Sequence, residues 1–147
     1  MLLLPIAVAP DDNDTLLVTC RFLPEVTTFA DDLVDARDKG REAVEEALGG
    51  RLARWEAFDL PDADETRAAV EAGTFVKVSL QATMKVLLFR ACKQMDVTRA
   101  ELARRLGWHR EQVDRLFRID HASRVDQIDA AMAAIGKTFD LEVRPAA

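Results

Sequence analysis

The sequence has few of the residues that build metal and redox centres. Its 147 residues include only two cysteines and two histidines. Cys20 and Cys92 form no CxxC pair or other metal-ligand spacing. His109 and His121 lie twelve residues apart, with no cysteine or carboxylate cluster to complete a zinc site. We therefore expect no metal or other cofactor, and two reduced thiols of the kind found in cytoplasmic proteins.

Long apolar runs are also missing. No stretch approaches the roughly 18 consecutive apolar residues that a transmembrane helix needs. The apolar opening lacks the basic start of a signal peptide, contains Pro5 and leads directly to Asp11 and Asp12. With 49% hydrophobic and 31% charged residues, the composition predicts a soluble globular protein, which we expect in the cytoplasm.

Each half of the chain has an excess of one charge. Residues 1–81 contain eight Lys and Arg against seventeen Asp and Glu, a balance of −9. Residues 82–147 contain twelve against nine, a balance of +3, and the whole chain carries −6. An acidic first part and a basic second part predict two surfaces with different partners.

The first half, residues 1–78, predicts an α+β module of order β-β-β-α-β. Residues 2–9 and 15–23 have the apolar and β-branched composition of two strands, joined through an acidic turn at 11–14. Residues 26–29 add a short third strand.

A helix is expected from residue 31. Small and apolar residues recur there at steps of three and four, as in a helix that packs on a sheet: Leu33, Ala36, Gly40, Ala43 and Ala47. The glycine pair at 49–50 is expected to weaken or kink this helix. An acidic connector at 59–73, in which we allow one helical turn, leads to a strand at 74–78.

This module lacks the groups of a nuclease site. A centre of the ribonuclease H type needs carboxylates from several strands and a helix around metal ions. Here Asp11, Asp12 and Asp14 crowd one turn, the strand interiors have no carboxylate, and the half contains no histidine. We therefore predict that the chain is not an enzyme. Metal-dependent cleavage that is lost on replacing Asp11 and Asp14 would overturn this interpretation.

The second half, residues 79–147, predicts a helical domain. Four helices are expected to start near residues 79, 99, 109 and 124. Ser79 caps the first, and the capping boxes TRAE (98–101) and SRVD (123–126) open the second and fourth.

The second and third of these helices have helix-turn-helix spacing. Ala103 is small where the helices must approach closely, Gly107 suits the turn, and Val113 can anchor the third helix in the core. A plain helical hairpin does not require these three residues in register, so the pattern favours a DNA-binding unit over a helical bundle with a solvated basic face.

The exposed positions support DNA binding. Arginine, glutamine and carboxylates read base edges, and the third helix carries four of them: Arg110, Glu111, Gln112 and Arg115. Phosphate contacts are predicted around them for Lys85, Thr98, Arg99, Arg104, Arg118, His121 and Arg124.

Residues 138–143 alternate polar and apolar side chains, which predicts a short C-terminal strand. Phe139, Leu141 and Val143 lie on one face of it. Because a helical domain offers this strand no partner, we expect it to pair with a second copy in a homodimer or higher homo-oligomer.

Taken whole, the chain resembles the HicB antitoxins of HicA–HicB toxin–antitoxin systems. The resemblance rests on LLVTCRFLPEVTTFADDLVDARDKGREAVEEAL in the first half. It rests more specifically on MKVLLFRACKQMDVTRAELARRLGWHREQVDRLFRIDHASRVDQIDAAMAAIGKTFDLEV, which is similar to the C-terminal helix-turn-helix of one HicB subgroup. The Leu-Pro-Gly-Cys often seen in the family is Leu-Pro-Glu-Val at 23–26 here.

The resemblance implies a partial ribonuclease H-like module at 1–78 that binds a small basic mRNA-cleaving toxin, HicA. It also implies a helix-turn-helix domain at 79–147 that represses the antitoxin's own operon by binding operator double-stranded DNA. The toxin-facing residues are expected among the acidic side chains of the first helix, which are Asp35, Asp38, Glu42, Glu45 and Glu46.

The alternative is a stand-alone repressor whose first module senses a small ligand. A pocket with convergent polar groups would favour it. A small basic reading frame beside the gene would favour the antitoxin.

Overall fold

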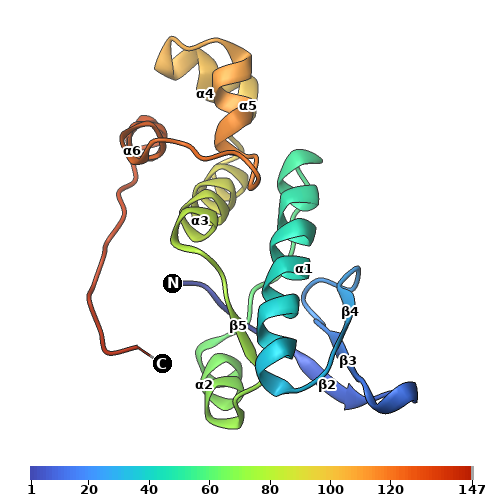
Figure 1. Cartoon of the computed structure of the whole chain (residues 1–147). Coiled ribbons are helices and arrows are strands. Elements are labelled where there is room, and N and C mark those ends of the chain that lie inside the picture. Colours follow the sequence, from blue (N-terminus) through green and yellow to red (C-terminus); the bar gives the residue numbers. More distant parts are fainter. Residues whose placement is uncertain (147) are drawn as a thin grey trace.

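The computed structural model of the chain describes residues 1–146 and is a mixed α+β structure (Figure 1). Its strands are β1 (Leu3–Pro5), β2 (Ala7–Pro10), β3 (Leu16–Thr19), β4 (Thr27–Ala30) and β5 (Phe75–Lys77). Its helices are α1 (Leu33–Ala53), α2 (Ala63–Ala72), α3 (Leu80–Gln94), α4 (Arg99–Leu106), α5 (Arg110–Leu116) and α6 (Val125–Ala134).

The strand expected at 2–9 is two strands, which corrects the sequence prediction. β1 pairs antiparallel with β5, whereas β2 belongs to an antiparallel sheet of order β2-β3-β4. The break falls at Ile6, whose side chain is buried in the core and whose backbone N–H donates to the Thr74 carbonyl at 3.0 Å. Residues 3–10 therefore connect the two sheets.

The helix α1 packs on these strands through a glycine. A Cβ atom added to Gly40 would lie 3.1 Å from Cγ1 of Val76 and 3.4 Å from Cγ1 of Val18, so a larger residue would push helix and sheet apart. The side chain of Asp32 caps the helix by accepting from the Asp35 N–H at 2.9 Å.

The glycine pair at 49–50 does not interrupt α1, contrary to the sequence prediction. An added Cβ on Gly49 would lie 3.5 Å from Cβ of Ile119, an ordinary van der Waals distance, so the helix meets the second half of the chain at this point. Tertiary packing thus outweighs the low helix propensity of glycine here.

The connector at 59–73 contains a full helix rather than a single turn. α2 begins with a capping box, in which the side chain of Asp62 accepts from the Glu65 N–H and the side chain of Glu65 accepts from the Asp62 N–H. It ends at Gly73, whose φ of 73° is the left-handed conformation that glycine adopts at low cost.

The two halves of the chain share one hydrophobic core. Trp55, just after α1, meets the rings of Phe89 and Phe117 edge to face, with centroids 5.1 and 4.8 Å apart. Arg90 of α3 donates to the Phe58 carbonyl at 3.1 Å, which ties the same segment to the second half. The predicted boundary at residue 78 stays a prediction.

In the second half, the expected cap at Ser79 is confirmed, because its hydroxyl accepts from the Ala82 N–H. The capping box expected at 123–126 is wrong. Ser123 is buried and its hydroxyl donates to the Arg115 carbonyl at 3.3 Å, while Arg124 stands at the start of α6 without a side-chain cap.

The C-terminal residues are extended along one side of the molecule (Figure 1). Within residues 1–146 of the single chain, 138–143 form no strand, which corrects the predicted C-terminal element. Phe139 packs against the core, whereas Leu141 and Val143 are exposed. Their pairing with a second copy stays a prediction.

A fully buried lysine joins α3 to the segment after α5. The Lys85 ammonium donates to the carbonyls of Arg115 at 3.2 Å and of Arg118 and His121 at 2.6 Å each. Three donors meet three acceptors at the end of a helix, where carbonyls carry the negative end of the dipole. Burial nevertheless lowers the pKa of the Lys85 amine to about 8, with Asp120 raising it and Arg118 lowering it further.

Replacing Lys85→Met should lower the free energy of unfolding by about 2–4 kcal/mol, because it leaves buried carbonyls without a donor. Urea unfolding followed by circular dichroism measures this. The control is Lys137→Met, at an exposed position, which should stay within about 0.5 kcal/mol of the unaltered chain. Equal stability of the two variants would contradict the role of Lys85.

The difference in free energy of unfolding between the unaltered chain and Lys85→Met should also depend on pH. The Lys85 pKa is about 8 in the folded chain against 10.5 for an ordinary lysine, so between these values the unfolded chain binds more protons. The free energy of unfolding of the unaltered chain should therefore rise with pH across that interval, relative to Lys85→Met, by up to about 3 kcal/mol. Below about pH 8 the difference should be constant. Burial raises the pKa of both cysteine thiols in both chains, so their titration cancels in the comparison. A flat difference up to pH 10.5 would contradict the prediction.

Candidate functional site

The helices α4 and α5 form the pair that the sequence predicted. They are joined by residues 107–109, and the Trp108 N–H donates to the Ala103 carbonyl at 3.0 Å. Gly107 has a φ of 66°, and both Ala103 and Val113 are buried between the helices and the core. The small residue, the turn glycine and the apolar anchor thus take their expected places.

The four predicted base-reading side chains are all exposed on α5. Gln112 accepts from the His109 N–H at 2.9 Å and so caps the helix, and Arg110 pairs with Asp114 at 3.2 Å. Glu111 and Arg115 have no side-chain hydrogen bond or ion pair within residues 1–146. Of these four exposed side chains, two make no polar contact within the described residues, and the other two are held only by a helix cap or an exposed ion pair.

Several predicted phosphate-contacting residues also lie at the surface. Arg118 and Arg124 each donate from Nε and Nη2 to the carboxylate two residues further on, Asp120 and Asp126. Exposed pairs of this kind are weak, so these arginines can exchange a carboxylate for a phosphate. Thr98 is exposed, with its hydroxyl accepting from the Glu101 N–H at 3.1 Å.

Two further candidates lie near the helix, one half-buried and one exposed. His121 is half-buried, and its carbonyl accepts from Lys85. Arg104 is exposed and pairs with Glu101.

One predicted phosphate contact is wrong, and a second is engaged within the fold. Lys85 is fully buried with its ammonium on three carbonyls, so it cannot reach a phosphate. Arg99 lies over the Trp55 ring at 5.2 Å and donates to the Ala53 carbonyl at 3.2 Å. Arg99 therefore connects the two halves of the chain, and we leave it out of the DNA surface.

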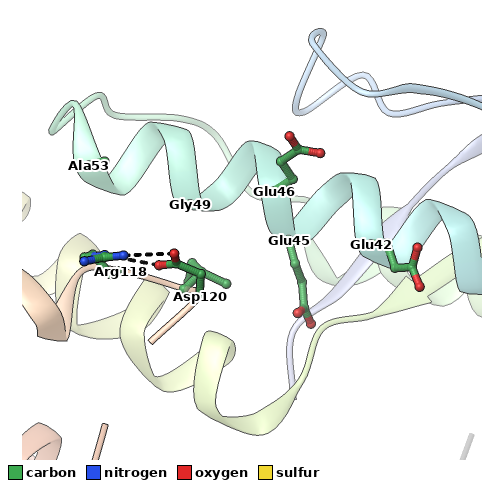
Figure 2. A pocket seen from close by; sticks show the side chains of 8 residues that line it. Glu42, Glu45, Glu46, Gly49, Ala53, Arg118 and Asp120 are labelled. Carbon is green, nitrogen blue, oxygen red and sulfur yellow. Dashed lines mark hydrogen bonds and ion pairs between the residues drawn. The ribbon is translucent and has the colours of Figure 1, made fainter. Parts of the chain in front are cut away.

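The acidic side chains of α1 divide into two groups. Glu45 is directed toward α3, where it accepts from the Ser79 N–H at 2.8 Å, and Figure 2 shows it pointing away from Glu46. Asp35 accepts from the Asp31 N–H at 2.9 Å and pairs with Lys39, whose hydrogen bond lowers the pKa of the Asp35 carboxyl.

Both of these carboxylates stabilise the fold. Three others, Asp38, Glu42 and Glu46, are exposed and are not used in this way within the described chain. The acidic surface that remains for a partner is therefore smaller than the sequence predicted.

A groove of about 600 Å³ lies between the two halves (Figure 2). One wall is α1, with Glu42, Glu45, Glu46, Gly49 and Ala53, and the other is the turn after α5, with Arg118, Ile119 and Asp120. Sequence reasoning missed this junction, because no local pattern relates residues that lie some seventy positions apart.

Among the residues that the structure describes, neither the cysteines nor the potential metal ligands are grouped into a redox or metal site. Both cysteines are buried, and burial raises the pKa of the Cys92 thiol to about 11. No group of three or more potential metal ligands occurs among residues 1–146. None of the described helices has the length and apolar character needed to span a membrane.

Comparison with known proteins finds several relatives that share one name. No protein-family model matches the chain. Antitoxin HicB of Escherichia coli (strain K12) is 28% identical over 137 residues, which cover 93% of this chain and 96% of the relative. Antitoxin HicB of Pseudomonas fluorescens (strain Pf0-1) is 29% identical, with 92% and 90% covered.

A third relative, Antitoxin HicB 2 of Photorhabdus laumondii, is 32% identical over 106 residues, which cover 69% of this chain and 76% of the relative. All three are named as antitoxins and none as an enzyme, in agreement with the prediction of a non-enzymatic protein. The chain belongs to the HicB antitoxin family.

Proposed function

We propose that this chain neutralises a HicA-type RNA-cleaving toxin through residues 1–78 and represses its own operon by binding operator DNA through α5. The observation that carries the proposal is the match to antitoxins over 93% of the chain, since such a match includes both the acidic first half and the α4–α5 pair. The first half then acts as a partial ribonuclease H-like module without its catalytic site, and the second as a helix-turn-helix domain.

The toxin-binding surface is assigned to the exposed carboxylates of α1. A toxin that cleaves RNA must carry positive charge where it meets phosphates, and an acidic surface competes for the same charge. Asp38, Glu42 and Glu46 are exposed and fit this role, whereas Asp35 and Glu45 are engaged within the fold.

The DNA-binding surface is assigned to α5 and the basic side chains around it. Arg110, Glu111, Gln112 and Arg115 face solvent on one short helix, where a major groove can receive them. A homodimer, paired through residues 138–143, would present two such helices to two half-sites.

Co-expression with the small reading frames beside its gene should yield a stoichiometric complex with a small basic protein that is toxic alone. The double variant Glu42→Lys/Glu46→Lys should lose at least about tenfold in affinity for that protein, because it reverses two charges at the proposed interface. Mass measurement of the eluted complex and titration calorimetry test both statements.

The matched control is Glu71→Lys, an exposed charge reversal on α2 that should bind the partner normally. A homodimer that elutes without any partner, yet still shifts upstream DNA, would contradict the antitoxin proposal. That result would favour a stand-alone repressor with a ligand-sensing first module.

Replacing Arg115→Ala should weaken specific operator binding by about 1–3 kcal/mol, because it removes a base contact. Arg124→Ala should instead weaken binding to all sequences about equally, because it removes a phosphate contact. Gel-shift titrations against the upstream fragment and a scrambled fragment separate the two effects. Unchanged sequence preference in Arg115→Ala would exclude its role as a base reader.

A further inference from the structure

Two side chains of α3, one helical turn apart, hold the segment that follows α5. The Gln81 amide donates to the Ser123 carbonyl and accepts from the Ser123 N–H, both at 2.9 Å. Lys85 donates to the carbonyls of Arg115, Arg118 and His121. We call these two side chains and their backbone partners the α3 clamp; it fixes the main chain at both ends of residues 115–123.

The α3 clamp acts on the same residue that the proposed function assigns to base reading. The side chain of Arg115 is exposed, while its carbonyl accepts from both Lys85 and the Ser123 hydroxyl. The backbone of Arg115 is therefore fixed from inside while its guanidinium faces outward.

The helix α5 is too short to hold its own direction. It has seven residues, about two turns, and isolated helices of that length are not stable in water. Its start is held by the Gln112 cap, and its body by the buried side chains of Val113, Leu116 and Phe117. These apolar contacts bury one face of the helix, but they are not directional, unlike the hydrogen bonds of the α3 clamp. That direction depends on the contacts at its C-terminal end.

We propose that Lys85 and Gln81 are positioning residues for DNA reading, which set the angle of α5 so that Arg115 and its neighbours meet the base edges. The inference rests on the proposed function of α5. Directional hydrogen bonds suit this task better than an apolar contact, because an ammonium with three donors and a planar amide each fix the atoms that they bind. An apolar side chain at either position would fill space without fixing direction.

Loss of the α3 clamp should affect specific DNA binding more than non-specific binding. Loss of the α3 clamp leaves the basic surface intact, so non-specific binding to phosphates should change little. Specific binding should fall, because a tilted helix no longer places its side chains against the bases.

The test uses full-length Lys85→Met and Gln81→Met, with Val76→Ala as a control for stability. Val76 is buried in β5 against α1, so its truncation weakens the core without touching residues 115–123. Affinities for the fragment upstream of the gene and for a scrambled fragment of equal length are measured on the folded fraction of each variant. Amide hydrogen exchange of residues 110–123 is followed in parallel.

We expect both α3 variants to lose about tenfold or more in the ratio of specific to non-specific affinity, the equivalent of one good base contact. Exchange of residues 110–123 should accelerate in them relative to α3 itself. Val76→Ala should keep the ratio within about twofold of the unaltered chain. If Lys85→Met fails to fold, Gln81→Met decides, since it removes only the two Ser123 contacts.

A ratio that is preserved in the α3 variants, or lost equally in Val76→Ala, would overturn the positioning role while leaving DNA binding in place. If the unaltered chain binds the upstream fragment no better than the scrambled one, the proposed function of α5 fails, and the inference fails with it. The two failures are distinguished by the unaltered chain alone.

Discussion

The arrangement of the whole molecule depends on the close approach of one helix to both halves of the chain. α1 has 21 residues, roughly 31 Å at 1.5 Å per residue. In its first half Gly40 lets it lie directly on Val18 and Val76 of the strands, and near its end it meets Ile119 at Gly49. A single rigid element thus sets the distance between the sheet and the turn that follows α5.

Local signals in the sequence were sufficient to predict most elements. The Ser79 cap and the turn at Gly107 mark helix ends through contacts within a few residues, and both are found where they were expected. The α4–α5 pair was predictable for the same reason, since Ala103 and Val113 reflect packing between neighbouring helices. The family resemblance was likewise visible in the sequence and is now supported by relatives of similar length.

The site residues that were misassigned have partners far away in the sequence. Lys85 and Arg99 have the composition of a DNA-contacting surface, but carbonyls some thirty to forty-six positions away occupy their donors. Glu45 belongs to an acidic face by its spacing, yet it binds a backbone amide 34 positions later. Periodicity shows which face of a helix is polar, but it does not show which of those polar groups the fold itself uses.

The shared aromatic cluster of Trp55, Phe89 and Phe117 has a consequence for how the chain fails under stress. Domains joined by a bare linker melt one at a time, so one can survive the other. Here a ring from the first half packs edge to face on two rings of the second, and the hydrophobic core continues across the junction. Unfolding should therefore be a single cooperative transition. Under the proposed functions, heat or damage would remove toxin control and operon repression from the same molecule at the same moment.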